Sequence, residues 1–357
     1  MIRRILMTGD TVGGVWSFTL ELAEALGAHG IHVVLAALGG PPTLGQRLEA
    51  CRIANLDLLP SDFKLEWMDD PWRDVASSGN WLLDLEEEYA PDVVHLNSFG
   101  HGALAWRAPV VVTAHSCVLS WWAAVKGGAA PEEWRGYRKT VTASLHAADA
   151  VTAPSRAMAE LLAEHYGVHA CRVIPNGRLA ARFRRAEKEP FVLTAGRLWD
   201  EAKNLAAVAQ AARRLPWPVY CAGAGSQPSG SGMTMLGQLA PDVLADWYAR
   251  ASIYALPARY EPFGLSALEA AHSGCGLVLG DIASLREVWG DAAVFVPPEN
   301  PDALADAVNG LIRDPARREA LAQAAAQRAQ QYTPRRMADD YLATYRAAAA
   351  EERLCAS

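Results

Sequence analysis

The sequence lacks Cys-x-x-Cys pairs, Asp-x-Asp motifs and any long uninterrupted hydrophobic run. Its six cysteines stand far apart, so we expect reduced thiols rather than disulfides. The two longest uncharged segments, residues 108–125 and 215–241, contain prolines and polar residues, and neither predicts a membrane-spanning helix. Only five residues separate Arg3-Arg4 from Asp10, too few for the apolar core of a signal peptide, so we expect a cytoplasmic protein.

An excess of positive charge is also missing. The 357 residues include 33 Lys and Arg against 40 Asp and Glu, a formal net charge of −7. Most of the imbalance lies in residues 1–180, which contain 14 basic and 20 acidic residues. Binding to the phosphate backbone of nucleic acids requires a dense basic surface, so we expect no nucleic-acid partner. Peripheral contact with a membrane is not indicated either.

The sequence does contain a regular alternation of short apolar runs and amphipathic helical patterns, with 51% hydrophobic and 20% charged residues. This alternation is typical of parallel βαβ units. In the first half it predicts helices over 15–28 and 156–166 and strands over 2–7, 31–38, 92–96, 110–114, 150–152 and 171–174. Residues 176–189 are polar and without apolar periodicity, which predicts an interdomain linker.

The alternation resumes after the linker. It predicts strands over 191–195, 219–222, 233–236, 253–256, 276–279 and 293–296, and helices over 204–215, 243–251 and 264–273. From Asp302 the pattern is helical, with breaks at Asp314-Pro315 and Thr333-Pro334. We therefore predict an α/β protein with two parallel-sheet domains, over 1–178 and 190–333, and a terminal helix over 334–357. Ligands bind at the carboxyl ends of such strands, so two facing domains predict a site in the cleft between them.

Two predicted loops carry groups that suit a phosphate ligand. Gly13-Gly14 lies between the first strand and the first helix, where backbone N–H groups could approach an anion, although a tight turn without a ligand is the alternative. The spacing matches neither the dinucleotide-binding nor the P-loop motif. Arg197 and Lys203 flank the loop after the strand 191–195 and could converge on a diphosphate, or they could pair with Asp200 or Glu201.

A pair of glutamates follows the strand 253–256. Glu261 precedes a predicted helix, and Glu269 lies inside that helix among apolar neighbours. A carboxylate in that setting requires a partner, and ribose hydroxyls would be suitable donors. Helix capping is the alternative explanation for Glu261.

The carboxyl end of the strand 110–114 offers His115, although a lone histidine is more often structural. His95 and Asn97 end the neighbouring strand, and we expect them to line the site at most. Trp121 and Trp122 could stack on a sugar ring or an apolar acceptor, or pack in the core.

Taken together, these features resemble the retaining GT-B glycosyltransferases of the family 4 type (glycosyl transferases group 1). The similarity covers nearly the whole chain. It is strongest over residues 191–298, and Glu261-Pro-Phe-Gly-Leu with Glu269 eight positions on is its most specific element. The resemblance implies a fold of two Rossmann-like domains, with a C-terminal helix that crosses back to the first domain, the acceptor side. It also implies a nucleoside diphosphate sugar as the donor substrate, with a UDP-sugar favoured, and a saccharide or small-molecule acceptor.

The resemblance assigns roles to individual residues. Arg197 and Lys203 would hold the donor diphosphate and stabilise its developing charge, Glu269 would bind the ribose, and Glu261 would contact the donor sugar. His115 would support the oxocarbenium-like transition state. The backbone N–H groups of Phe263, Gly264 and Leu265 would approach the sugar and phosphates, and Gly13-Gly14 would close over the diphosphate.

Three departures from the family pattern bear on specificity. The usual His-Asp pair is His115-Ser116, the usual Asn-Gly-Val-Asp is Asn176-Gly-Arg178-Leu, and the loop 223–232 is short. Without an Asp-x-Asp motif or a His/Cys cluster we expect neither a metal nor a cofactor. Two alternatives to transfer remain open, a nucleotide-sugar 2-epimerase of the same fold and a non-catalytic subunit that binds nucleotide sugar.

Overall fold

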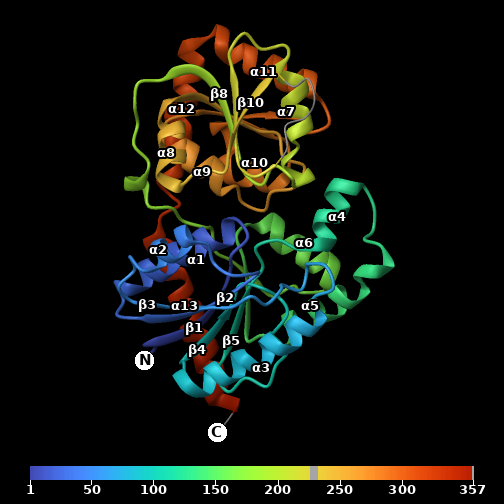
Figure 1. The fold of residues 1–357 in the computed structure, drawn as a ribbon, viewed down its shortest axis with the longest axis vertical. Coiled ribbons are helices and arrows are strands. Elements are labelled where there is room, and N and C mark those ends of the chain that lie inside the picture. Colours follow the sequence, from blue (N-terminus) through green and yellow to red (C-terminus); the bar gives the residue numbers. More distant parts are fainter. Residues whose placement is uncertain (226–231, 356–357) are drawn as a thin grey trace. The chain divides into compact units, whose positions relative to one another are not determined.

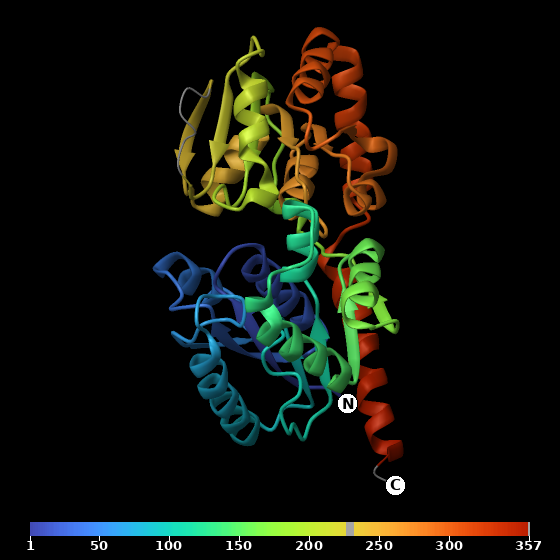
Figure 2. The ribbon, with the colours of Figure 1, turned by 90° about the vertical axis from the view of Figure 1, so that its right-hand side faces the viewer.

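The structure is a computed structural model that describes residues 1–225 and 232–355 (Figure 1). The chain divides into two compact units, which we describe separately. The first contains residues 1–123, 128–177 and the segment from Pro334 onward, and the second contains residues 124–127 and 178–333. Each unit has one parallel β-sheet with helices on both faces (Figures 1 and 2).

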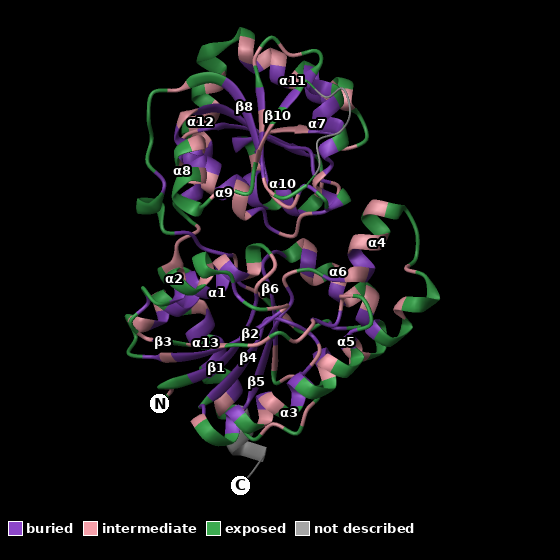
Figure 3. Cartoon of the chain, viewed as in Figure 1, coloured by how far each residue is buried: buried purple, intermediate pink, exposed green. Residues whose placement is uncertain are grey.

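The sheet of the first unit has seven strands in the order β3-β2-β1-β4-β5-β6-β7. Their bounds are Arg4–Asp10 (β1), His32–Leu38 (β2), Leu56–Pro60 (β3), Val93–Leu96 (β4), Val110–Thr113 (β5), Ala150–Ala153 (β6) and Cys171–Val173 (β7). The central strands β1, β2, β4 and β5 are mostly purple in Figure 3, because helices cover both of their faces. The strand order reverses between β1 and β4, and loops that leave the carboxyl ends there are the usual ligand site of such sheets.

The helices of the first unit form a layer on each face of this sheet. Their bounds are Gly14–Gly27 (α1), Leu44–Ala50 (α2), Trp72–Tyr89 (α3), Val118–Lys126 (α4), Arg135–Ala147 (α5), Arg156–Tyr166 (α6) and Pro334–Cys355 (α13), with a short turn over Glu132–Trp134 (η1). Alternate residues of β1 point to opposite layers: Ile5 and Met7 pack with α1 and α13, and Leu6 packs with α3, α5 and α6. The terminal helix therefore packs on the first unit, as predicted.

The sheet of the second unit has six strands in the order β10-β9-β8-β11-β12-β13. Their bounds are Glu189–Ala195 (β8), Val219–Ala222 (β9), Met233–Gly237 (β10), Ala251–Leu256 (β11), Gly276–Gly280 (β12) and Val294–Val296 (β13). The order again reverses next to the first strand of the unit, between β8 and β11. The two sheets thus share one topology, and both have the Rossmann-like architecture predicted from the sequence.

Two helical layers cover the second sheet as well. The elements are Ala180–Arg182 (η2), Glu201–Lys203 (η3), Leu205–Ala212 (α7), Pro241–Arg250 (α8), Leu265–His272 (α9), Ala283–Trp289 (α10), Gly290–Ala292 (η4), Pro301–Arg313 (α11) and Pro315–Ala329 (α12). One core contains residues of α8, α9, α10 and α12, and the other contains residues of α7 and α11. Within the described residues, no helix is both long and apolar enough to cross a membrane.

Candidate active site

The loop between β1 and α1 has the backbone that its glycines allow. Gly13 is the N-cap of α1 and has φ 98° and ψ −144°, a conformation that residues with a side chain rarely adopt. No side chain caps the helix and its first turn has no acidic residue, while Gly13 and Gly14 are both exposed. Asp10 stabilises the turn of this loop, because its Oδ1 accepts the N–H of Val12 at 2.6 Å. The loop thus presents the positive end of a 14-residue helix to an anion.

Asn97 joins the ends of three strands in the first unit. Its backbone N–H donates to Thr8 Oγ1 at 2.8 Å, and its side-chain Nδ2 donates to the carbonyl of Thr8 at 2.7 Å. Its Oδ1 lies 2.8 Å from Nε2 of His115, which follows β5. Because a carbonyl can only accept, the amide NH₂ must face Thr8, and Oδ1 must face His115.

This orientation determines the form of the His115 ring. An amide oxygen accepts, so Nε2 of His115 carries the proton and Nδ1 keeps its lone pair. Burial lowers the pKa of His115 to about 3, and the edge of Phe18 lies 4.4 Å away between ring centroids. His115 is therefore a neutral group at physiological pH, with an Nδ1 that can accept a hydrogen bond.

His95 has a structural role, which lies within the limit that the sequence set for it. It is 0% exposed, its Nε2 lies 2.7 Å from Thr113 Oγ1, and its Nδ1 lies 2.7 Å from the hydroxyl of Tyr345 on α13. Burial lowers its pKa to about 3. The terminal helix covers this end of β4, so His95 links the helix to the sheet instead of facing a ligand.

Trp121 and Trp122 are half-buried residues of α4. Their ring centroids are 5.9 Å apart, and Trp122 lies 6.5 Å from Trp134 of η1. The first contact is edge-to-face and the second is tilted, and together they form an aromatic cluster that joins α4 to η1. Packing accounts for part of both rings, and a role toward an acceptor stays a prediction.

Arg197 follows β8 in the second unit and pairs with a neighbour in its own loop. Its Nη2 lies 3.2 Å from Asp200 Oδ2, and its guanidinium lies 5.6 Å from the ring centroid of Trp199. Asp200 is buried and also caps η3 by accepting the N–H of Ala202 at 3.0 Å. The loop ion pair that was an alternative to phosphate binding is thus present, and it also fixes the orientation of the guanidinium.

Lys203 and Glu261 meet although they are 58 residues apart. Lys203 Nζ lies 2.5 Å from Glu261 Oε2, and the two side chains are 15% and 13% exposed. The other carboxylate oxygen accepts the N–H of Gly264 at 3.0 Å and that of Phe263 at 3.5 Å. Glu261 therefore caps α9 and holds the lysine at the same time, at the carboxyl ends of β8 and β11.

The start of α9 depends on Gly264. Its φ of 91° is left-handed, and a Cβ there would lie 3.2 Å from Leu285 Cδ2. The preceding Phe263 is buried against Tyr332, with the ring planes at 90° and the centroids 5.3 Å apart. Phe263 and Gly264 thus contribute backbone N–H groups to the helix start, and Leu265 is the first helical residue.

Glu269 is the fifth residue of α9 and thus lies inside the helix, as predicted. Its Oε1 lies 2.9 Å from Arg178 Nη2, and the two side chains are 13% and 10% exposed. The guanidinium of Arg178 also lies 5.3 Å from the ring centroid of Phe183, which stacks on His272. The partner that a carboxylate in this setting requires is therefore an arginine that follows β7.

Two family models together match most of the chain. The model described as Glycosyltransferase Family 4 matches residues 12–182, and the model described as Glycosyl transferases group 1 matches residues 189–314. A D-inositol 3-phosphate glycosyltransferase from Xylanimonas cellulosilytica is 30% identical over 88% of this chain and 87% of its own length. The chain belongs to glycosyltransferase family 4. A glycogen synthase from Mycobacterium tuberculosis is 29% identical over 89% of this glycosyltransferase and 86% of its own length.

Solved structures agree with the fold of this glycosyltransferase. A sucrose-phosphate synthase from Thermosynechococcus elongatus has a TM-score of 0.79 at 21% identity, with 99% of this chain and 100% of that chain covered. HepE from Anabaena, solved in complex with UDP-glucose, has a TM-score of 0.74 at 17% identity and covers 96% of this chain and 98% of its own. The GT-B architecture predicted from the sequence is confirmed.

Sequence reasoning missed two residues of this glycosyltransferase that contact predicted site residues. Arg178 was noted only as a departure in Asn176-Gly-Arg178-Leu, and its distance of 91 positions from Glu269 hid the ion pair. Asn97 was expected to line the site, but it orients His115. Within residues 1–225 and 232–355, no group of three His, Cys, Asp or Glu side chains could hold a metal ion. The loop 223–232, which would bear on the nucleobase, falls largely outside the described residues.

Proposed function

We propose that this glycosyltransferase moves a hexose from a nucleoside diphosphate sugar to a hydroxyl of a saccharide or small-molecule acceptor, with retention and without a metal ion. The observation that carries the proposal is the Lys203–Glu261 pair at the start of α9, with Arg197 in the same loop as Lys203. These groups lie where parallel sheets bind ligands. The similarity of the fold to HepE, solved with UDP-glucose, makes a UDP-sugar the donor to test first.

In this proposal Lys203 and Arg197 stabilise the leaving diphosphate. Arg197 offers a planar fork, and Lys203 offers a point charge already held in place by Glu261. Both cations now face carboxylates, so the diphosphate would compete with Asp200 and Glu261 for them. A dianionic group with several acceptor oxygens is the ligand best suited to such competition.

Glu269 is assigned to the ribose hydroxyls. Arg178 holds Oε1 of this carboxylate and thereby orients the group. A carboxylate that is fixed by an ion pair loses less freedom when it accepts from a ligand. The arginine thus acts through Glu269 and is a positioning residue.

His115 is assigned to the donor sugar as a hydrogen-bond acceptor. Its neutral ring with the proton on Nε2 leaves Nδ1 to accept from a sugar hydroxyl. A neutral ring adds no positive charge next to the cationic sugar that develops in the transition state, whereas an imidazolium would repel it.

Retention follows if both bonds change on one face of the sugar. The bond from the anomeric carbon to the diphosphate oxygen breaks, the acceptor oxygen bonds to the same face, and the acceptor's proton passes to the leaving diphosphate. No side-chain base is required, so the role of the chain is to hold the diphosphate and the sugar in place.

The experiment is the release of UDP from UDP-glucose by the full chain, in EDTA, with water or glucose as acceptor. We expect turnover, loss of most of it in Lys203→Met, and parent-like turnover in the control Arg214→Gln, which removes two exposed ion pairs of the same unit. Turnover that needs added Mg²⁺ would contradict the metal-independent mechanism. A product that is an epimer of the donor sugar would establish the epimerase instead, and UDP-glucose binding without any product would establish a binding subunit.

A further inference from the structure

The second unit has a pocket at the other end of its strands from the candidate active site. Its volume is about 320 Å³. Lys188 directly precedes β8, Ser252 is the second residue of β11, and Gly274 precedes β12, so all three lining residues lie at amino ends of strands. Lys203 and Glu261 follow the carboxyl ends, and six residues of strand span about 20 Å. The pocket is therefore a separate site.

Three cationic side chains line this pocket, from Arg185, Lys188 and Arg318. In the described part of the chain, none of them forms an ion pair with a carboxylate. Glu319 is the one acidic lining residue, and its Oε1 lies 3.3 Å from Gln323 Nε2. The lining thus carries three positive charges against one negative charge.

Neutral groups hold the three cations in place. Lys188 Nζ donates to backbone carbonyls at 2.7, 2.9 and 3.3 Å, those of Ser273, Ala249 and Tyr248. Arg318 Nη1 donates to the carbonyl of Leu311 at 2.7 Å, and its guanidinium lies 5.0 Å from the ring centroid of Trp217. Carbonyls and an aromatic face orient these cations but do not cancel their charge.

Arg185 is the cation with most of its donors left for a ligand. Its Nε lies 3.5 Å from the carbonyl of His272, a long contact, and within the described residues its two Nη groups have no hydrogen bond or ion pair. The stems of both arginines pack next to glycines: a Cβ on Gly274 would lie 3.5 Å from Arg185 Cδ, and one on Gly276 would lie 3.4 Å from Arg318 Cγ.

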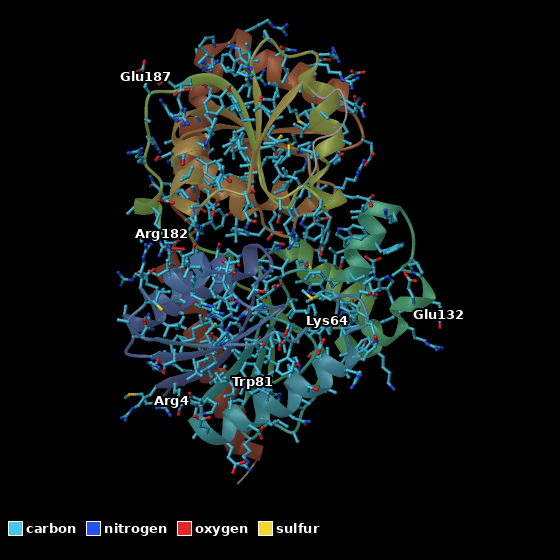
Figure 4. All side chains as sticks on the ribbon, viewed as in Figure 1. Arg4, Lys64, Trp81, Glu132, Arg182 and Glu187 are labelled. Atoms are coloured by element: carbon cyan, nitrogen blue, oxygen red, sulfur yellow. The ribbon has the colours of Figure 1, made fainter. Side chains whose placement is uncertain are left out.

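The acidic neighbours in the chain do not neutralise the pocket. Glu187, between Arg185 and Lys188, is exposed and directed outward in Figure 4. Glu189 pairs with Arg250 at 3.2 Å, and its carboxylate is thereby engaged elsewhere. The two guanidinium groups can donate to phosphate oxygens, and the ammonium group, whose three donors are taken by carbonyls, contributes its positive charge.

We propose that this pocket binds the phosphate group of a small phosphorylated metabolite, or inorganic phosphate itself. Ligand pockets range from about 300 to 1,000 Å³, and this one lies at the small end. A compact phosphate monoester fits that volume better than a nucleoside diphosphate. The site is independent of the proposed transfer reaction, because its residues lie at the amino ends of the strands.

The experiment is calorimetric titration of the full chain with inorganic phosphate and with glycerol 3-phosphate, at constant ionic strength, with chloride as the reference anion. We expect one site for each probe, weakened at least about tenfold in Arg185→Gln because a charge-assisted fork is lost. Glu319→Gln should tighten binding, because it removes the one negative charge of the lining. The matched control Arg214→Gln should bind as the parent does.

Two further measurements separate this pocket from the candidate active site. Saturating UDP should leave the phosphate affinity unchanged, and Lys203→Met should retain it. Tighter binding of glycerol 3-phosphate than of phosphate would identify a monoester as the ligand, and the reverse would identify the free ion. The proposal is wrong if Arg185→Gln and Arg318→Gln, both still able to bind UDP, keep the parent's phosphate affinity, or if UDP displaces phosphate.

Discussion

Replacement of Lys203 by methionine separates the structural role of this lysine from its proposed chemical role. Its Nζ lies 2.5 Å from Glu261 Oε2, and the two side chains are only 15% and 13% exposed. Loss of one partner of a fully buried pair costs about 3–5 kcal/mol of folding free energy, and an exposed pair contributes below about 1 kcal/mol. Glu261 would keep the N–H of Gly264 at 3.0 Å and the start of α9, so we expect a loss of about 1–2 kcal/mol.

The expected effect on catalysis is larger than the effect on stability. A group that stabilises the charge of a transition state contributes about 2.7–4 kcal/mol, which is a 100- to 1000-fold change in turnover. Urea denaturation of Lys203→Met and its rate of UDP release from UDP-glucose measure the two quantities on one preparation. The double variant Lys203→Met/Glu261→Gln should regain part of the lost stability, because no unpaired carboxylate remains, but it should not regain activity.

A Lys203→Met variant that is destabilised as expected but releases UDP at a rate close to that of the parent would contradict the chemical role. Lys203 would then be a structural partner of Glu261 and nothing more. Arg259→Gln is the matched control, because Arg259 forms an ion pair with Glu299 at 2.5 Å in the same unit and has no role in the proposed reaction. It should leave the rate of UDP release unchanged.

Three more predictions follow from the site. Arg178→Gln should weaken UDP binding, measured by calorimetry, about tenfold, because Glu269 loses the ion pair at 2.9 Å that orients it. Arg178→Lys should recover part of this loss, and an unchanged UDP affinity in Arg178→Gln would contradict the positioning role. Asn97→Asp should raise the pKa of His115 from about 3, because a carboxylate that accepts from Nε2–H stabilises the imidazolium. The acid limb of the pH–rate profile should therefore move to higher pH, and a profile identical to the parent's would refute the proposed tautomer. Acid should destabilise the first unit, because folding lowers the pKa values of His95 and His115 from 6.5 to about 3 and the unfolded chain therefore binds more protons between these two values. As the pH is lowered through that window, the free energy of unfolding should fall by up to about 1.4 kcal/mol per pH unit for each histidine, and urea midpoints should fall with it. The dependence on pH should be weaker in His95→Gln.

The strands and helices that place the site were predictable from the sequence, because each carries its own periodicity. Val219–Ala222 and Arg156–Tyr166 have the bounds that the apolar pattern gave them. The pattern missed β3, because this edge strand is only partly buried and its residues Leu56–Pro60 include outward-facing positions. It also missed α3, because Ser78 and Gly79 interrupt the apolar face of that helix. Local periodicity reports on the two faces of one element, not on its position at the edge of a sheet.

The partners within the site were harder to predict, because they are distant in the sequence. A motif placed Glu261 and Lys203 on their loops, but only the fold shows that the two residues neutralise each other. His95 lies near the carboxyl end of β4, where site residues are expected in a parallel sheet. Tyr345 of the terminal helix, 250 positions later, contacts its ring and covers it. Arg178 shows the opposite case, since a departure from a family pattern became the partner of a residue inside that pattern.

The central claim is transfer with retention at the anomeric carbon, and proton NMR of the first sugar product tests it most directly. UDP-α-glucose is given to the full chain in EDTA with water as acceptor, and spectra are recorded before the free glucose mutarotates. The account predicts α-glucose as the initial product, formed by the parent and by Arg259→Gln but not by Lys203→Met. Initial β-glucose from the parent chain would contradict it.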